Sequence, residues 1–217
     1  MSDSRESPKS LDLSDDVTLN LLSTLEENQH VSQRSLATRL GVALGMANGL
    51  LKRSVRKGLI KVQQAPAKRY AYYVTPQGFA EKSRLVADYL AASLSFFRKA
   101  RDQYTVLFEE LTQQNRKSVV LYGAGELAEI ATLSAHETGV ELIGVVALGS
   151  NRSEIGGLPV INSLDALDEH TFDGVVVTCR EKPQSVYDGL VETFGPDRVH
   201  AVPLLHVSQA PSGEKQA

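Results

Sequence analysis

The chain has 217 residues, 42% hydrophobic and 23% charged, a composition typical of globular proteins with one large or two small domains. It contains neither an apolar stretch long enough for a membrane span nor a secretory leader, so we expect a cytoplasmic protein without membrane contact. The single cysteine, Cys179, excludes an internal disulfide and a cysteine-based zinc site, and the five histidines lack metal-ligand spacing. We therefore expect no metal site.

The net charge of −3 conceals a strong asymmetry along the chain. Residues 30–75 hold nine Lys and Arg and no Asp or Glu, whereas residues 118–217 hold five basic and fourteen acidic residues. A block without carboxylates creates a local positive field, which favours binding of a polyanion because each neutralised phosphate releases counterions. The alternative is a soluble basic domain that binds no polyanion.

Residues 14–75, which follow a polar tail at 1–13, have the pattern of a winged helix-turn-helix domain. Apolar residues at helical spacing, with a serine cap at Ser32 and a stop at Gly41, predict helices over 14–28, 33–40 and 44–57. Because a short turn separates the last two helices, the third occupies the position of a recognition helix that enters the major groove of double-stranded DNA.

Two β-prone runs follow the third helix, at 59–64 and 69–75, and predict a hairpin. Its tip carries Lys68 and Arg69. A basic hairpin beside a recognition helix is a wing, which would contact the DNA backbone.

A long helix is predicted over 76–115, because Thr75 and Pro76 form an N-cap and first-residue pair. Spacings of four and three predict a coiled-coil seam, made of Val86, Leu90, Ser93, Phe97, Ala100, Tyr104, Leu107 and Leu111. Two copies paired along this helix would form a homodimer that presents two winged domains to a palindrome. The alternative is that the seam packs only against the chain's own domains.

Residues 117–207 predict a Rossmann-like, doubly wound parallel sheet of four or five strands, so the overall class is α/β. A polar tail follows at 208–217. Apolar strands are expected around 118–122, 141–147, 172–179 and 198–205, with intervening helices that include 165–170 and 182–195.

A glycine motif follows the first of these strands and matches the G-x-G-x-x-G/A pattern at Gly123, Ala124, Gly125, Glu126, Leu127 and Ala128. The glycines would permit a tight turn and let a pyrophosphate approach the helix N-terminus. The second strand ends without the acid that binds a ribose, and Glu126 adds negative charge, which disfavours NAD(H). We expect a nucleotide-type ligand at residues 123–127, with a nucleotide, a nucleotide-sugar and NAD(H) left open. The alternative is a module kept only for assembly.

The remaining chemistry-bearing residues do not form a catalytic constellation. No nucleophile triad or carboxylate pair is evident, and Tyr122 and Tyr187 lack the spaced lysine of a Tyr-x-x-x-Lys pair, so we do not expect an enzyme. Cys179, at a strand end beside Arg180, is either a redox-responsive thiol or a small buried apolar residue. The histidines of this half, including His200, are expected on the surface.

The run VSQRSLATRLGVALGMANGLLKRSVRKGLIKV, followed by AYYVTPQGFAEKSRL, resembles the winged-helix domain of MarR-type regulators, particularly those associated with exopolysaccharide biosynthesis loci. The resemblance covers about residues 15–100 and implies a dimer that binds DNA. It also implies DNA contacts from several residues, and Ala43 departs from it, because these regulators usually carry a capping serine there. The complete set of candidate DNA-binding residues is Gln33, Arg34, Met46, Ala47, Asn48, Lys52, Arg53, Arg56, Lys68 and Arg69.

The second half, VVLYGAGELAEIA through EIGGLPVINSLDAL, resembles the small Rossmann-like domain of nucleotide-sugar-modifying and polysaccharide-biosynthesis proteins. It is also similar to the sensor domain of NADH-responsive redox repressors, although it lacks their acid after the second strand and their additional swapped helix. The sequence therefore predicts a dimeric transcriptional regulator that senses a nucleotide-type metabolite and controls polysaccharide biosynthesis. The alternatives are an NAD(H)-responsive repressor and a nucleotide-sugar enzyme with an accessory DNA-binding domain.

Overall fold

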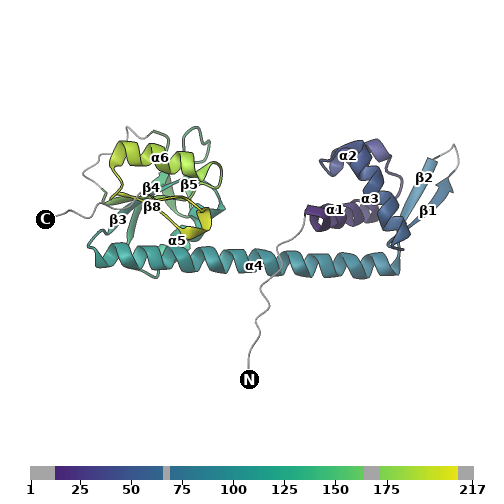
Figure 1. The fold of residues 1–217 in the computed structure, drawn as a ribbon, viewed down its shortest axis with the longest axis horizontal. Helices are drawn as coiled ribbons and strands as arrows, with labels where there is room; N and C mark the ends of the chain where they lie inside the picture. The colour runs from purple at the N-terminus through teal and green to yellow at the C-terminus, as the bar shows by residue number, and fades with distance from the viewer. Residues whose placement is uncertain (1–12, 66–68, 164–171, 210–217) are drawn as a thin grey trace, which may run out of the picture. The chain divides into compact units, whose positions relative to one another are not determined.

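The computed structural model describes residues 13–65, 69–163 and 172–209. The chain divides into two compact units, one up to Ser95 and one from Phe96 onward, and each is described by itself (Figure 1). Most of both predicted tails, the wing tip with Lys68 and the helix predicted at 165–170 lie outside the described residues. No helix in the described ranges combines the length and apolarity that a membrane crossing requires.

Unit 1 contains the three helices of a helix-turn-helix and a hairpin, followed by the first half of the helix α4 (Pro76–Gln113). The elements are α1 (Leu13–Glu27), α2 (Gln33–Arg39), α3 (Leu44–Arg56), β1 (Ile60–Ala65) and β2 (Arg69–Val74). The side chain of Ser32 caps α2 by accepting a hydrogen bond from the Ser35 N–H at 3.1 Å. Gly41 and Gly58 follow α2 and α3 with φ of 63° and 70°, a left-handed conformation that favours glycine. The predicted helices, turn and hairpin are thus confirmed.

The core of unit 1 lies between the three helices and the hairpin. Its buried residues include Leu21, Leu22 and Leu25 of α1, which are 0% exposed. The hairpin is antiparallel, with Ile60 opposite Val74. Burying these apolar side chains fixes α3 on the outside of the core with one face left to solvent.

α4 (Pro76–Gln113) is one uninterrupted helix that contributes residues to both units. The Thr75 hydroxyl oxygen caps it by accepting from the Gly78 N–H at 3.0 Å, and donates to the Gly58 carbonyl at 2.6 Å. In unit 1, Leu85 is fully buried. The helix ends two residues before the predicted 115, because Asn115 has a φ of 60° and breaks the helical conformation.

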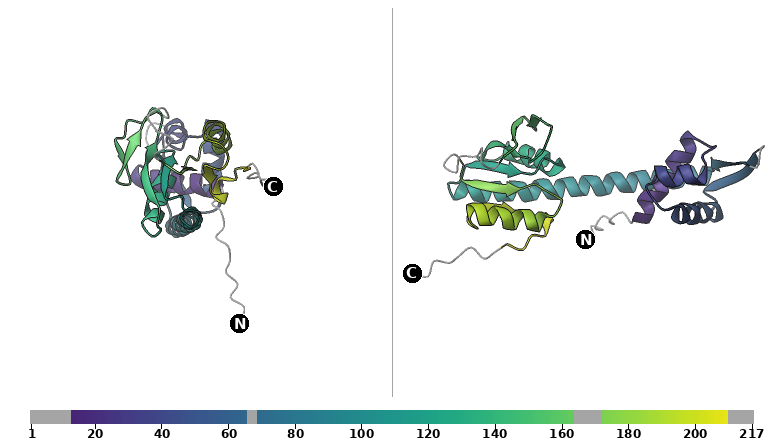
Figure 2. Two further views of the ribbon diagram at one scale, coloured as in Figure 1. Left: turned by 90° about the vertical axis from the view of Figure 1, so that its left-hand side faces the viewer. Right: turned by 90° about the horizontal axis from the view of Figure 1, so that it is seen from above.

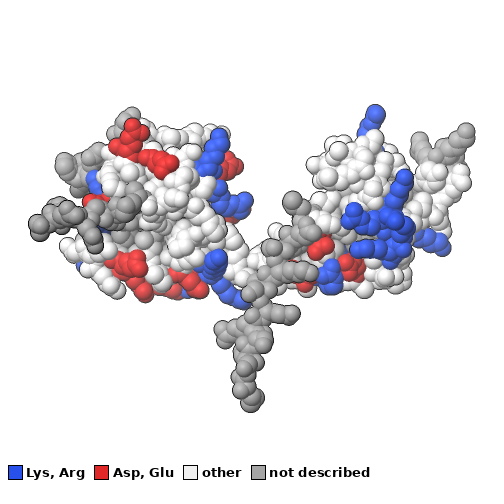
Figure 3. Space-filling view, in the orientation of Figure 1, with Lys and Arg blue, Asp and Glu red and all other residues white. Residues whose placement is uncertain are grey.

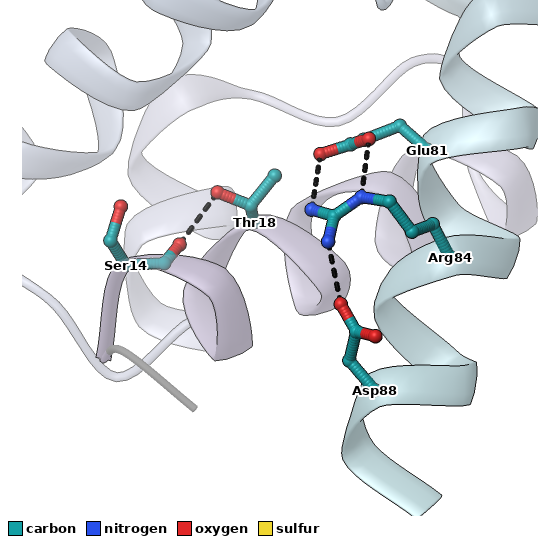
Figure 4. A network of polar contacts seen from close by, with 5 residues as sticks. All are labelled: Ser14, Thr18, Glu81, Arg84 and Asp88. Carbon is teal, nitrogen blue, oxygen red and sulfur yellow. Dashed lines mark hydrogen bonds and ion pairs between the residues drawn. The ribbon is translucent and has the colours of Figure 1, made fainter. Parts of the chain in front are cut away.

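Charged side chains also tie the first turns of α4 together. Arg84 donates two hydrogen bonds to the Glu81 carboxylate and a third to Asp88, as Figure 4 shows beside the α1 bond from Thr18 to the Ser14 carbonyl. The hydrogen bonds from Arg84 lower the pKa of Glu81. These pairs are exposed, so each adds only a few tenths of a kcal/mol to the stability of the helix.

Unit 2 is built on a six-stranded sheet in the order β5-β6-β4-β3-β7-β8. The strands are β3 (Ser118–Tyr122), β4 (Glu141–Val146), β5 (Glu154–Ile155), β6 (Leu158–Ile161), β7 (Gly174–Val177) and β8 (Val199–Ala201). All neighbours are parallel except β5 and β6, which form a short antiparallel hairpin. A parallel sheet was predicted, but this hairpin was not. Its strands, on either side of Gly156 and Gly157, have only two and four residues, which is too short for a measurable hydrophobic periodicity.

Helices cover both faces of this sheet. β4 lies on one side of β3 and β8 lies on the far side of β7, so right-handed crossovers place α5 (Glu126–Ala135) and α6 (Pro183–Phe194) on opposite faces (Figures 1 and 2). The second half of α4 lies beside α5, where the Ser134 hydroxyl donates to the Arg101 carbonyl at 3.3 Å. A short 3₁₀ helix at Pro203–Leu205 follows β8.

The second half of the predicted seam is buried in unit 2 itself. Ala100, Tyr104 and Leu111 are at most 1% exposed, and Phe97 and Leu107 pack against the same core. The expectation that these positions pair with a second copy is therefore wrong, because the chain's own sheet covers them. The first half remains open, since Val86 is 38% and Leu90 54% exposed.

His200 differs from its predicted surface position. It lies in β8 and is half-buried, and burial lowers its pKa to about 4. Its Nε2 atom is buried without a hydrogen-bond partner among the described residues. A lone histidine in a three-residue strand carries no sequence signal of this burial.

Candidate nucleic-acid interface and glycine-turn pocket

The predicted recognition helix, α3, has one buried and one exposed face. Ala47, Leu50, Leu51 and Ser54 are buried. The assignment of Ala47 to DNA contact is therefore wrong, because its side chain is 0% exposed and points into the core. Met46, in contrast, is 61% exposed.

Asn48 lies at the boundary of these two faces and is half-buried. Its Oδ1 atom is buried and has no hydrogen-bond partner in the part of the chain that the structure describes. A buried acceptor without a partner costs roughly 1–3 kcal/mol.

The exposed side of α3 and the start of the hairpin carry a set of cations that we call the cationic surface: Lys52, Arg53, Arg56, Lys57 and Lys61. All five are exposed, and within the described ranges none of them forms an ion pair. Figure 3 shows Lys and Arg side chains gathered on this side of unit 1. Gln33 and Arg34 are also exposed, at the start of α2.

A groove of about 550 Å³ separates α3 from the hairpin. Its floor is apolar, with Leu51 and Val55 on one wall, and its rim is cationic; the other lining residues are Gln33, Lys52, Arg56, Val62, Tyr70 and Tyr72. Arg69 begins β2 at the far end of the hairpin. The groove thus has a basic rim and lies between the recognition helix and the hairpin.

The glycine motif forms the turn between β3 and α5, at the carboxyl edge of the parallel sheet. Gly123 has a φ of 118°, and a Cβ atom there would lie 2.7 Å from the Cys179 nitrogen. Gly125, the N-cap of α5, has an ordinary φ of −94°, and a Cβ there would meet nothing within 4 Å. Gly123 is therefore required by the fold, whereas Gly125 is not.

A pocket of about 270 Å³ opens over this turn, and we call it the glycine-turn pocket. It lies between β3 and β7, where the direction of chain progression across the sheet reverses, which is where open α/β sheets bind ligands. Its lining residues are Ala124, Gly125, Glu126, Leu127, Thr178, Cys179, Arg180 and Glu181. The structure thus brings the predicted residues 124–127 together with the end of β7.

The charges around this pocket differ from those of a simple phosphate site. Arg180 donates to the Glu126 carboxylate at 3.3 Å, and these side chains are 65% and 77% exposed. The carboxylate of Glu126 thus stands at the helix N-terminus, where a phosphate would otherwise bind, and Arg180 is already engaged. The Cys179 thiol donates to the Glu181 carbonyl at 3.2 Å and is half-buried.

Thr178 and Tyr104 contribute to this site although the sequence did not predict it. Thr178 donates from its hydroxyl to the Gly123 carbonyl at 2.7 Å, which fastens the glycine turn to the end of β7. Tyr104 of α4 donates to the Val177 carbonyl at 3.1 Å. Both contacts join segments more than fifty residues apart, so no local sequence pattern predicts them.

A family model described as winged helix-turn-helix DNA-binding matches residues 14–61, which form the helices and first strand of unit 1. A search of curated proteins finds no match. Among solved structures, a MarR-family transcriptional regulator from a Rhodococcus species is 22% identical, with a TM-score of 0.34, over 37% of this chain and 59% of that chain.

Two further solved structures have similar scores. MepR, a transcription regulator of a Staphylococcus aureus multidrug efflux pump, is 18% identical over 38% of this chain and 63% of that chain, with a TM-score of 0.34. The PcaV transcriptional regulator from Streptomyces coelicolor is 20% identical over 46% of this chain and 75% of that chain, with a TM-score of 0.37. The chain spans less than two thirds of the Rhodococcus and Staphylococcus regulators.

Proposed function

We propose that this chain is a DNA-binding transcriptional regulator of the MarR type. The observation that carries the proposal is the cationic surface, which is exposed on the recognition helix of a winged helix-turn-helix and free of ion pairs among the described residues. No Asp or Glu occurs between Glu27 and Glu81, so this surface has no carboxylates of its own segment to neutralise it. A duplex supplies the missing negative charge.

In the proposed complex α3 enters the major groove. Met46 and Asn48, near its N-terminal end, contact base edges. The cationic residues, Gln33 and Arg34 contact phosphates. The predicted contact from the Arg69 side chain lies outside the described residues. The groove between α3 and the hairpin then holds the sugar-phosphate backbone, with Lys52 and Arg56 on its rim.

The regulator is proposed to act as a homodimer through the first half of α4. Three large apolar side chains are open there: Tyr89, Leu90 and Leu94 are 48%, 54% and 52% exposed. Together with Val86 they follow helical spacing along one side, which is the arrangement of a helix that packs against another helix. Dimerisation would bring two copies of α3 to the two half-sites of a palindrome.

Unit 2 is proposed to be a Rossmann-like sensor of a nucleotide-type metabolite. Its parallel strands, numbered along the chain, follow the order 3-2-1-4-5, which matches the first five strands of the 3-2-1-4-5-6 order of doubly wound dinucleotide-binding sheets. The open space above Gly125 supports a ligand there, because the fold itself has no need of a glycine at that position. The regulated process, polysaccharide biosynthesis, is proposed from the sequence resemblance alone.

A salt series tests the DNA-binding proposal. Gel shifts on DNA upstream of the chain's own gene, between 50 and 200 mM salt, should show log Kd rising linearly with log salt, with a slope of about 0.9 per phosphate contacted. Lys52→Ala/Arg56→Ala should weaken binding and reduce the slope by about 2. The matched control, Arg98→Ala/Lys99→Ala, removes the same charge from exposed positions of α4 and should leave the slope unchanged. A salt-insensitive shift, or equal loss in both variants, contradicts the proposal.

A further inference from the structure

Tyr104 is a buried polar residue whose position the proposed function does not explain. Its side chain is 0% exposed within the core of unit 2, and its ring stacks on Phe108 with the centroids 6.1 Å apart. Burial raises its pKa, so the phenol stays protonated and donates its proton to the Val177 carbonyl at 3.1 Å. A phenylalanine would fill nearly the same space without this bond, so the hydroxyl adds a contact that packing alone does not require.

The acceptor of this bond leads directly into the glycine-turn pocket. Val177 is the last residue of β7, and the next two residues, Thr178 and Cys179, line the pocket. The Thr178 N–H donates to the Tyr122 carbonyl at 2.8 Å and its hydroxyl donates to the Gly123 carbonyl at 2.7 Å. The segment 177–179 is thus bonded on one side to the turn and on the other side to α4.

The turn and this segment are closely packed against each other. An added Cβ at Gly123 would lie 2.7 Å from the Cys179 nitrogen and 2.9 Å from its Cα. Because close-packed interiors transmit strain, a displacement of Cys179 or the turn by a ligand would also shift the Val177 carbonyl. The Tyr104 hydroxyl must then follow the carbonyl or lose its bond.

Tyr104 belongs to the same uninterrupted helix that begins at Pro76, directly after the hairpin of unit 1. In unit 1 this helix buries Leu85 completely, and its Lys82 forms an ion pair with Glu26 of α1. α4 is therefore anchored by side chains in both the proposed DNA-binding unit and the proposed sensor unit.

We propose that Tyr104 is a positioning residue that couples occupancy of the glycine-turn pocket to α4, and through this helix to the DNA affinity of unit 1. This inference rests on the proposed function. The coupling is reciprocal, so an occupant that weakens DNA binding is itself bound less tightly when DNA is present. The bond from Tyr104 to Val177 carries the effect because it links the residue that precedes the pocket-lining Thr178 to the helix.

Cys179 allows the test without a known ligand, because it is the only cysteine of the chain and lines the pocket. Iodoacetamide converts it to a thioether, with the thiolate sulfur displacing iodide, and leaves a small amide group in the pocket. Kd for DNA is measured before and after alkylation in the wild type and in Tyr104→Phe. Alkylation should change the wild-type Kd by at least about 5-fold and the Tyr104→Phe value by less than about 2-fold.

Matched controls separate this coupling from damage. Tyr187→Phe, a change at another buried tyrosine of the same core, should keep the wild-type response. Cys179→Ser treated with the reagent should show no change. If the alkylated protein loses its cooperative melting transition, Cys179→Met replaces alkylation as a smaller occupant.

Hydrogen exchange of residues 97–111 is read in the same samples, so that the result does not depend on DNA binding. We expect occupancy to change their exchange in the wild type and not in Tyr104→Phe. Absence of DNA binding by the untreated protein contradicts the proposed function, whereas unchanged exchange after alkylation overturns the coupling. An equal response of wild type and Tyr104→Phe also overturns it.

Discussion

The same substitution should destabilise the protein at one glycine of the β3–α5 turn and have little effect at the other. In Gly123→Ala the alanine must keep a backbone φ of 118°, and its Cβ would lie 2.7 Å from the Cys179 nitrogen. The backbone conformation costs about 1–3 kcal/mol, and the contact with the main chain adds about 1–3 kcal/mol because the segment after β7 must shift. We expect a loss of about 3 kcal/mol in the free energy of unfolding of unit 2.

Gly125→Ala is the matched control, since it adds the same methyl group two residues away. Its φ is −94° and nothing lies within 4 Å of the new atom, so stability should change by less than about 1 kcal/mol. Thermal unfolding of the full chain followed by circular dichroism should show the transition of unit 2 falling by roughly 10 °C for Gly123→Ala only. Equal transitions in the two variants would refute the assignment of Gly123 to the fold.

Three further predictions concern stability and assembly. Burial lowers the pKa of His200 to about 4, so between pH 6.5 and 4 the unfolded chain binds a proton that the folded chain does not. The free energy of unfolding should therefore fall by up to about 3 kcal/mol as the pH drops through this window. Urea titrations should show this fall flattened in His200→Asn but not in the exposed His206→Asn, and a parallel fall in both variants would reject it. Gly78→Ala places a Cβ 2.1 Å from the Leu59 carbonyl oxygen and should destabilise unit 1 by more than about 2 kcal/mol in urea unfolding. Gly49→Ala, whose Cβ would meet open space, should not destabilise unit 1. Equal stability of the two variants would contradict the close contact at Gly78. Leu90→Glu/Leu94→Glu should shift the chain from dimer to monomer in sedimentation, whereas Leu133→Glu on α5 should leave the dimer intact. An unchanged mass in the double variant would argue against dimerisation through α4.

Much of unit 1 was predictable because its signals are local. The helix starts and stops at Ser32, Gly41 and Gly58 and the apolar spacing between them set the elements within one or two residues. Ala47 was misassigned because a small residue fits both an exposed and a buried face, and only the packing of α3 decides between them. Periodicity gives the stripe of a helix but not its partner.

The same limit explains α4 and the pocket. One continuous apolar stripe was predicted, yet the structure covers its second half with the chain's own sheet and leaves its first half open, a division that depends on tertiary contacts. The glycine motif located the turn correctly. The ion pair of Glu126 with Arg180 and the bond from Tyr104 to Val177 join distant segments, so they became visible only in three dimensions.

The exposed side of α3 should face a duplex, and crosslinking tests this most directly. A photoreactive amino acid replaces Met46, which is 61% exposed, and in a second variant it replaces Thr193, which is exposed on α6 of unit 2. With upstream DNA at moderate salt, position 46 should crosslink to the duplex and position 193 should not. Equal crosslinking at the two positions, or crosslinking from 193 alone, would contradict the account.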